Sequence, residues 1–151
     1  MITHPQQALD AMFKLFNDKW KAGATAIVGY VPQIVWPLTD VRAIPAADKY
    51  WCRVSTQSVG EPLASLSEVV EPGKRMYEPF GLLFIQLFVP KSDAQAAVRG
   101  LALATLARNS FKGVQTPNGV WFRESKINNL PDEEKSYRFN IIVEYEYNEI
   151  I

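Results

Sequence analysis

Two segments of the chain have the hydrophobic spacing of helices. In residues 3–22, polar positions separate large apolar side chains that recur every three or four residues, namely Leu9, Met12, Phe13, Phe16 and Trp20. Thr3 and Gln6 have the spacing of a capping box, and Gly23 is a natural helix stop. We expect this helix to lay an aromatic stripe on a sheet.

The second predicted helix, residues 92–110, is apolar over most of its circumference. Its leucines do not form a single stripe, because Leu101 and Leu103 point to opposite sides of a helix. Ser92 and Gln95 repeat the capping-box spacing at its start. A helix with this pattern is expected to be buried on more than one side.

Alternating side chains predict strands between and after the helices. The β-like segments are residues 26–28, 34–36, 49–58, 75–89, 119–126 and 136–148. Residues 75–89 are apolar on both faces, so we expect this strand to be covered on both sides. The last two segments are predicted to pair as an antiparallel hairpin because their connection is short.

Residues 60–74 are the least regular part of the sequence, with two prolines and two glycines. A connection of this length inside a compact domain is usually functional or mobile. The order of helix, strands, helix and two strands predicts a single α+β domain over residues 1–151. We expect two helices packed on one face of a mostly antiparallel sheet of roughly four to six strands.

The charge balance and the single cysteine narrow the class of protein. Lys plus Arg and Asp plus Glu are both 16, so the chain lacks the basic surplus of a phosphate-binding protein. A net charge near zero suits a chain that associates with other proteins.

The single cysteine and the apolar segments bear on where the protein is found. The one cysteine cannot form an intramolecular disulfide. The first five residues do not resemble a signal peptide, and the apolar run 80–90 is too short for a membrane helix. We expect a cytoplasmic protein with no membrane partner.

Candidate chemistry is sparse. His4, the only histidine, is interpreted as an exposed residue at a helix start, and Cys52 as a small core residue. Glycine-rich phosphate-binding motifs and zinc-ligand spacings are absent from the sequence. Glu144 and Glu146 share the polar face of the last strand and are expected to pair with basic groups on a neighbouring strand or subunit. These patterns predict no enzyme activity, no cofactor and no metal.

The layout of the whole chain has a counterpart in a known family. Thr3-His4-Pro5 opens the first helix, Ile34-Val35-Trp36-Pro37 follows, and Phe88-Val89-Pro90 ends the strongest strand. An alanine- and leucine-rich helix and a final hairpin complete the order. This layout resembles the tail terminator, or tail completion, proteins of long-tailed bacteriophages, including small prophage proteins. The likeness lies in architecture and hydrophobic pattern over nearly the whole chain.

The resemblance implies a ring, typically of six copies, that closes the phage tail tube. One ring face would contact the tail-tube protein and the other the head–tail connector protein. The protein would be found in the bacterial host cytoplasm during assembly and in the virion tail afterwards. The family brings no catalytic residues. The candidate interaction residues are Glu61, Glu68, Glu71, Lys74, Arg75 and Leu103.

Three other interpretations remain open at this point. The chain could be another head–tail connector or a minor tail protein of related fold. It could be a small-ligand-binding or enzymatic α+β domain, with a pocket lined by Tyr50, Trp51, Arg53 and Arg123. A nucleic-acid-binding module is disfavoured by the charge balance.

Overall fold

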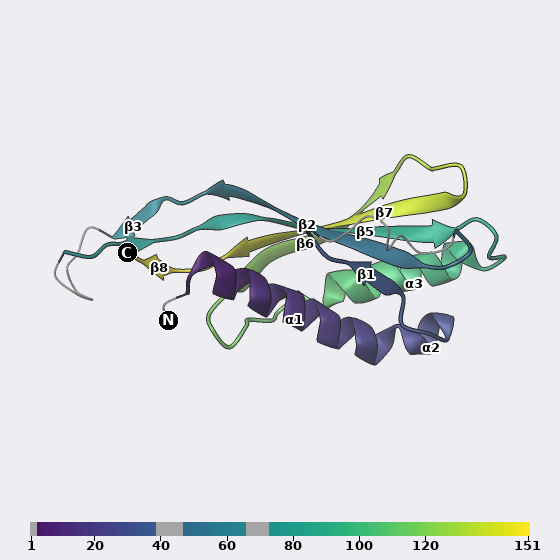
Figure 1. The fold of residues 1–151 in the computed structure, drawn as a ribbon, viewed down its shortest axis with the longest axis horizontal. Helices are drawn as coiled ribbons and strands as arrows, with labels where there is room; N and C mark the ends of the chain where they lie inside the picture. Colours follow the sequence, from purple (N-terminus) through teal and green to yellow (C-terminus); the bar gives the residue numbers. More distant parts are fainter. Residues whose placement is uncertain (1–2, 39–46, 66–72) are drawn as a thin grey trace.

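The chain folds into two layers, helices on one side and sheet on the other. The computed structural model describes residues 3–38, 47–65 and 73–151. In chain order the elements are α1 (Pro5–Gly23), α2 (Thr25–Val28), β1 (Gln33–Val35), β2 (Trp51–Gly60), β3 (Leu63–Ser65), β4 (Met76–Tyr77), β5 (Phe80–Pro90), α3 (Ala96–Asn109), β6 (Trp121–Leu130), β7 (Ser136–Glu146) and β8 (Glu149–Ile150). The long helices α1 and α3 lie on the same face of the main sheet (Figure 1). The predicted α+β class is confirmed.

The main sheet has five strands in the order β1-β2-β5-β7-β6. All its neighbouring strands are antiparallel except β1, which runs parallel to β2. The predicted hairpin is confirmed as β6 and β7. β1 pairs with residues 51–53 of β2 only, so residues 54–60 carry no second strand among those that the structure describes.

A smaller sheet in the order β3-β4-β8 lies at the end of the molecule away from α2 (Figure 1). It divides the single strand predicted for residues 75–89. Met76 and Tyr77 form β4 and pair with β8, and the longer β5 begins only after Pro79. The segment 60–74, predicted to be irregular, contributes β3, and its residues 66–72 lie outside the described part of the chain.

The core fills the space between the helices and the main sheet. Met12, Phe16 and Trp20 of α1 are all at most 1% exposed, which confirms the predicted aromatic stripe. They meet inward-facing residues of the sheet and α3, such as Leu83, Ile85, Leu87, Ile141, Val143 and Ala107. The Trp20 indole N–H donates to the carbonyl of Pro32 at 3.0 Å, so this buried polar atom is satisfied.

Three local predictions were wrong. Residues 26–28 form the short helix α2 and not a strand, because the N–H groups of Val28 and Gly29 bond back to Ala24 and Thr25. Gly29 then ends the turn at φ +84°, a conformation that favours glycine. The start of α3 lies at Ala96, four residues later than predicted. The capping box of α1 is formed by His4 and Gln7 and not by the predicted Thr3 and Gln6. The His4 N–H donates to Gln7 Oε1 at 3.1 Å.

No helix within the described ranges combines the length and the apolar character needed to cross a bilayer.

Candidate functional site

The candidate interaction residues lie in three different settings. Glu61 and Lys74 are exposed, and Arg75 is half-buried, with its backbone exchanging two hydrogen bonds with Ile151. Glu68 and Glu71 lie outside the described residues. Leu103 is fully buried in the core, so it presents no surface to a partner, and its assignment to an interaction surface is corrected.

The apolar surface of α3 lies on the opposite side of the helix from Leu103. Val98 is 74% exposed and Leu101 is 52% exposed. They share one helix face with Ala102 and Thr105, which follow at helical spacing. We call Val98, Leu101, Ala102 and Thr105 the α3 stripe. The expected burial of α3 on more than one side is therefore not provided by the described residues.

The α3 stripe faces away from the sheet. Gly100 marks the side of the helix that approaches the strands, because a Cβ atom there would lie 3.0 Å from Val89 and 3.3 Å from Phe139. Gly100 itself is buried. The stripe lies nearly half a turn round the helix from Gly100, so it forms part of the outer surface of the helix layer.

The second apolar surface lies on the face of the sheet opposite the helices. Figure 1 shows α1 and α3 below the sheet and its other face without a described helix. On β5, Leu83 and Ile85 point to the core, whereas Leu82 and Phe84 are half-buried on the outer face and Phe80 is 40% exposed. The predicted cover is present along the inner face, whereas on the outer face it is present only towards the end of the strand, where Phe88 is buried against Trp51.

A groove with a cavity volume of about 420 Å³ lies at one end of this outer face. Its apolar wall consists of Val59, Pro62, Phe80 and Leu82. Its charged residues are Glu78, Glu144, Glu146 and Arg123, so three carboxylates face one guanidinium. We refer to this set of residues as the outer groove. It lies where β2 ends and β5 begins in the main sheet, next to the residues that lead into the smaller sheet.

The charges in the outer groove are not balanced. Arg123 donates from Nε to Glu146 Oε2 at 2.5 Å, and this hydrogen bond raises the pKa of Arg123. The predicted pairing of Glu146 with a basic group on a neighbouring strand is thus confirmed. Glu144 makes no ion pair within the described part of the chain. It lies directly opposite Glu124 in the β6–β7 pair, where like charges repel.

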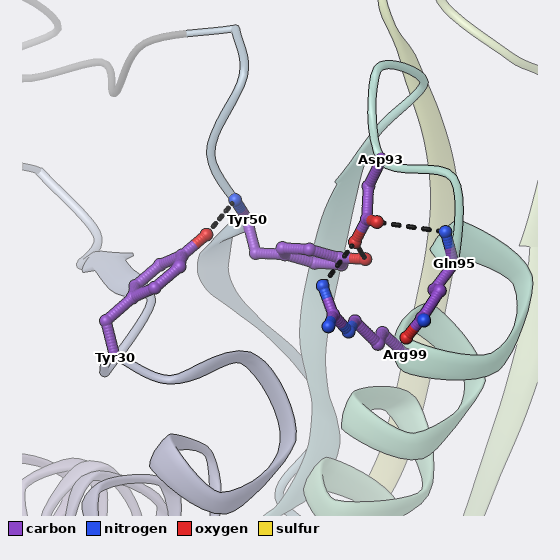
Figure 2. Close-up of polar contacts among 5 residues, drawn as sticks. All are labelled: Tyr30, Tyr50, Asp93, Gln95 and Arg99. Carbon is purple, nitrogen blue, oxygen red and sulfur yellow. Dashed lines mark hydrogen bonds and ion pairs between the residues drawn. The ribbon is translucent and has the colours of Figure 1, made fainter.

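A polar network joins the start of β2 to the turn before α3 (Figure 2). The Tyr50 hydroxyl donates to Asp93 Oδ2 at 2.6 Å, and Arg99 contacts the same oxygen at 3.3 Å. The Gln95 N–H donates to Asp93 Oδ1 at 2.9 Å. On the other side of Tyr50, its backbone N–H donates to the Tyr30 hydroxyl at 2.8 Å.

The protonation states in this network favour an anchoring role. Hydrogen bonds from Tyr50 and Gln95 hold the pKa of Asp93 below its usual value, with a smaller contribution from Arg99. Burial, followed by the bond to Asp93, raises the pKa of Tyr50. Near neutral pH the carboxylate stays ionised and the phenol stays protonated, so neither group is tuned to exchange a proton. The network fixes the β2 start against α3.

The pocket proposed from Tyr50, Trp51, Arg53 and Arg123 does not form. Tyr50 points to Asp93, while the Arg53 guanidinium lies 5.4 Å from the Trp51 ring and 5.8 Å from that of Phe88. Arg123 belongs to the outer groove, which is lined by none of the other three residues. These side chains therefore do not converge on one ligand.

The two residues with reactive side chains are placed as predicted. Cys52 is fully buried, which confirms it as a core residue, and burial raises the pKa of its thiol. His4 is exposed at the start of α1, and its Nδ1 lies 3.2 Å from Glu149 Oε2. This contact joins the first helix to β8 in the smaller sheet.

Comparison with known proteins identifies the fold alone. No protein-family model matches the chain, and no curated protein matches it. A solved structure aligns with 92% of this chain and 94% of its own length, with a TM-score of 0.60 and 15% sequence identity. The name of that protein states no activity or partner. The chain is therefore similar in fold to this protein over nearly its full length.

Proposed function

We propose that this chain is a structural subunit of a bacteriophage tail. In this role it forms a ring that ends the tail tube and contacts the head-side connector, and it resides in the virion tail. The proposal combines the resemblance of the sequence to tail terminator proteins with one structural observation. Two largely apolar surfaces that the described residues leave uncovered, the α3 stripe and the outer groove, lie on opposite sides of the two-layer fold.

The position of these surfaces supports a ring. A helix face exposed to water normally carries several charged side chains, whereas the four residues of the α3 stripe are uncharged and the same face gains a charge at Arg108 in the last turn. Surfaces on opposite sides of a subunit favour a head-to-tail contact, in which each copy uses a different surface for each neighbour. Such contacts close into a ring when a whole number of copies, each rotated by the same angle from the last, completes a full turn.

The first test is the mass of the purified protein by light scattering over a concentration series, followed by electron microscopy of the largest species. We expect the mass to rise to a fixed multiple of the monomer, with ring-shaped particles. The assembled species should bind the tail-tube protein of the same phage. A strict monomer at every concentration that does not bind tube protein would contradict the proposal.

A second experiment separates a tail terminator from a head–tail connector or a minor tail protein. The protein would be labelled with gold in isolated tails and in complete virions. A terminator is expected at the head-proximal end of tails that have not yet joined heads. Label found only on complete virions would favour a connector, and label elsewhere on the tail would favour a minor tail protein.

A further inference from the structure

We infer that the α3 stripe of one copy docks into the outer groove of the next copy. This inference rests on the proposed function, because it names the surfaces through which the ring would form. Neither surface is covered by the described residues of its own chain. The occupant of each would be the other surface on a second copy of this chain.

The α3 side of the contact is apolar with a positive end. Val98 and Leu101 project from the helix. Ala102 and Thr105, which follow them on the same face, are small enough to allow a second molecule to approach closely. The helix Ala96–Asn109 contains no acidic residue. Arg108, in its last turn, lies on the same side as Leu101 and makes no ion pair among the described residues.

The groove offers the complementary chemistry. Phe80 and Leu82 provide an apolar floor for aliphatic side chains, and Val59 is more than half exposed at its edge. The groove contains more carboxylates than cations. Among them, Glu144 makes no ion pair in the described part of the chain and lies opposite Glu124, which repels it. A guanidinium from a second copy would relieve this repulsion.

The directions of the two surfaces determine the kind of contact. The stripe points outward from the helix layer, since Gly100 on the other side of α3 contacts the sheet. The groove is lined by Phe80, Leu82 and Glu144, which alternate with the core residues of their strands and so face away from the helices. Figure 1 shows that α1 and α3 lie on the other face of the sheet. One copy can therefore donate its stripe to one neighbour and receive a stripe from another.

The test uses charge reversal at the two charged ends of the contact. Arg108→Glu places a carboxylate beside the stripe, and Glu144→Arg places a cation in the groove. Each variant alone sets like charges against each other at every contact, and we expect association to weaken by at least about tenfold. Lys19→Glu, an exposed reversal on α1, serves as the matched control and should associate like the unmodified chain.

Mixing the two variants provides the decisive measurement. In an equimolar mixture, each contact between unlike variants pairs a carboxylate with a guanidinium. Rings in which the two variants alternate should therefore form at concentrations where neither variant assembles alone. The double variant Arg108→Glu with Glu144→Arg should also assemble. Sedimentation velocity would measure association, and urea denaturation of each variant would establish that the monomers remain folded.

The outcomes distinguish this inference from the proposed function. If the unmodified chain assembles and both single variants assemble equally well, the stripe does not dock in the groove, while the ring itself stands. Loss of assembly with no recovery in the mixture also overturns the contact. If the unmodified chain stays monomeric but binds tail-tube protein through the groove, the occupant is that partner and not a second copy. A monomer that binds neither removes the proposed function as well.

Discussion

The interior and the two outward faces of this fold are built from similar residue types, yet the environments of those residues differ sharply. Leu103 and Leu101 lie two positions apart on α3, and one is fully buried whereas the other is 52% exposed. Leu83 and Leu82 on β5 show the same contrast across the sheet. The interior already has its partners within one chain. The outward faces carry apolar side chains that the described residues leave partly uncovered.

This difference shows that apolar content and structural role are separate properties. An apolar residue in the interior contributes to the free energy of unfolding of the monomer, through burial and close packing. An apolar residue on an outward face contributes little until another molecule covers it. Substitutions can therefore separate folding from assembly, and the following predictions do so in order of decreasing effect.

The largest effect is expected from paired leucine truncations on α3. Leu103→Ala should lower the free energy of unfolding by about 2–5 kcal/mol, because it leaves a cavity in the core. Leu101→Ala, the matched control on the same helix, should change it by less than about 1 kcal/mol. Urea denaturation of both variants at low protein concentration measures the difference. Equal losses in the two variants would mean that the α3 stripe is already covered in the monomer.

A second comparison uses two glycines on neighbouring strands. A Cβ atom at Gly81 would lie 2.3 Å from the carbonyl oxygen of Gln57 and 2.6 Å from the Tyr145 hydroxyl. Because a strand backbone cannot easily give way, Gly81→Ala should cost about 1–3 kcal/mol. At Gly60 the added atom would meet the edge of the Phe80 ring at 2.9 Å. That exposed ring can move, so Gly60→Ala should cost less, which thermal melts of both variants would reveal.

The third prediction concerns pH and the anchor between β2 and α3. The folded-state pKa of Asp93 lies below its ordinary value of 3.8, so its contribution to stability is present above that pH. The contribution is lost as the pH falls through the lowered pKa. Asp93→Asn should therefore be less stable than the unmodified chain near pH 6, and the difference should shrink as the pH falls from 3.8 through the lowered pKa.

Tyr50→Phe provides the control for this pH effect. The Tyr50 hydroxyl bond is the largest cause of the lowered pKa, so its removal should raise the Asp93 pKa towards 3.8. NMR titration of the carboxyl carbon would follow the change directly. An unchanged Asp93 pKa in this variant would show that the hydrogen bond in Figure 2 does not form in solution.

The smallest effect is expected on the outward face of the sheet. Glu124→Gln removes the repulsion with Glu144 and should stabilise the monomer by about 0.2–1 kcal/mol. Glu133→Gln is the control of opposite sign, because Glu133 lies 3.7 Å from Arg138 and its loss should be neutral or slightly destabilising. Chemical denaturation of the two variants would test the sign. Destabilisation by Glu124→Gln would mean that Glu124 already has a favourable partner.

Local patterns were sufficient for the elements with a clear period. The apolar positions of α1 and the alternation in β2 appear in the structure as predicted, and β6 and β7 form the predicted hairpin, although β6 runs to Leu130, four residues beyond the predicted end. Each depends on interactions between residues close in sequence or on one regular repeat. The central place of Cys52 in the core followed from the same alternation.

Local patterns failed where distant segments decide the conformation. Ile27 and Val28 have β-branched side chains but form the short helix α2, since their backbone N–H groups bond to the carbonyl of Ala24 just after α1. The strand predicted for residues 75–89 is split because β8, from the far end of the chain, pairs with β4. No spacing within either segment signals these partners.

The sequence by itself predicted a helix layer on a mostly antiparallel sheet, a balanced charge, and a second helix and a central strand that are apolar on more than one side. Only the tertiary structure decided that Leu101 and not Leu103 carries the excess on α3, and that Val59, Phe80 and Leu82 meet Glu144 in one groove. The reason is physical. Periodicity gives the faces of an element, whereas the packing of one element on another decides which face remains uncovered.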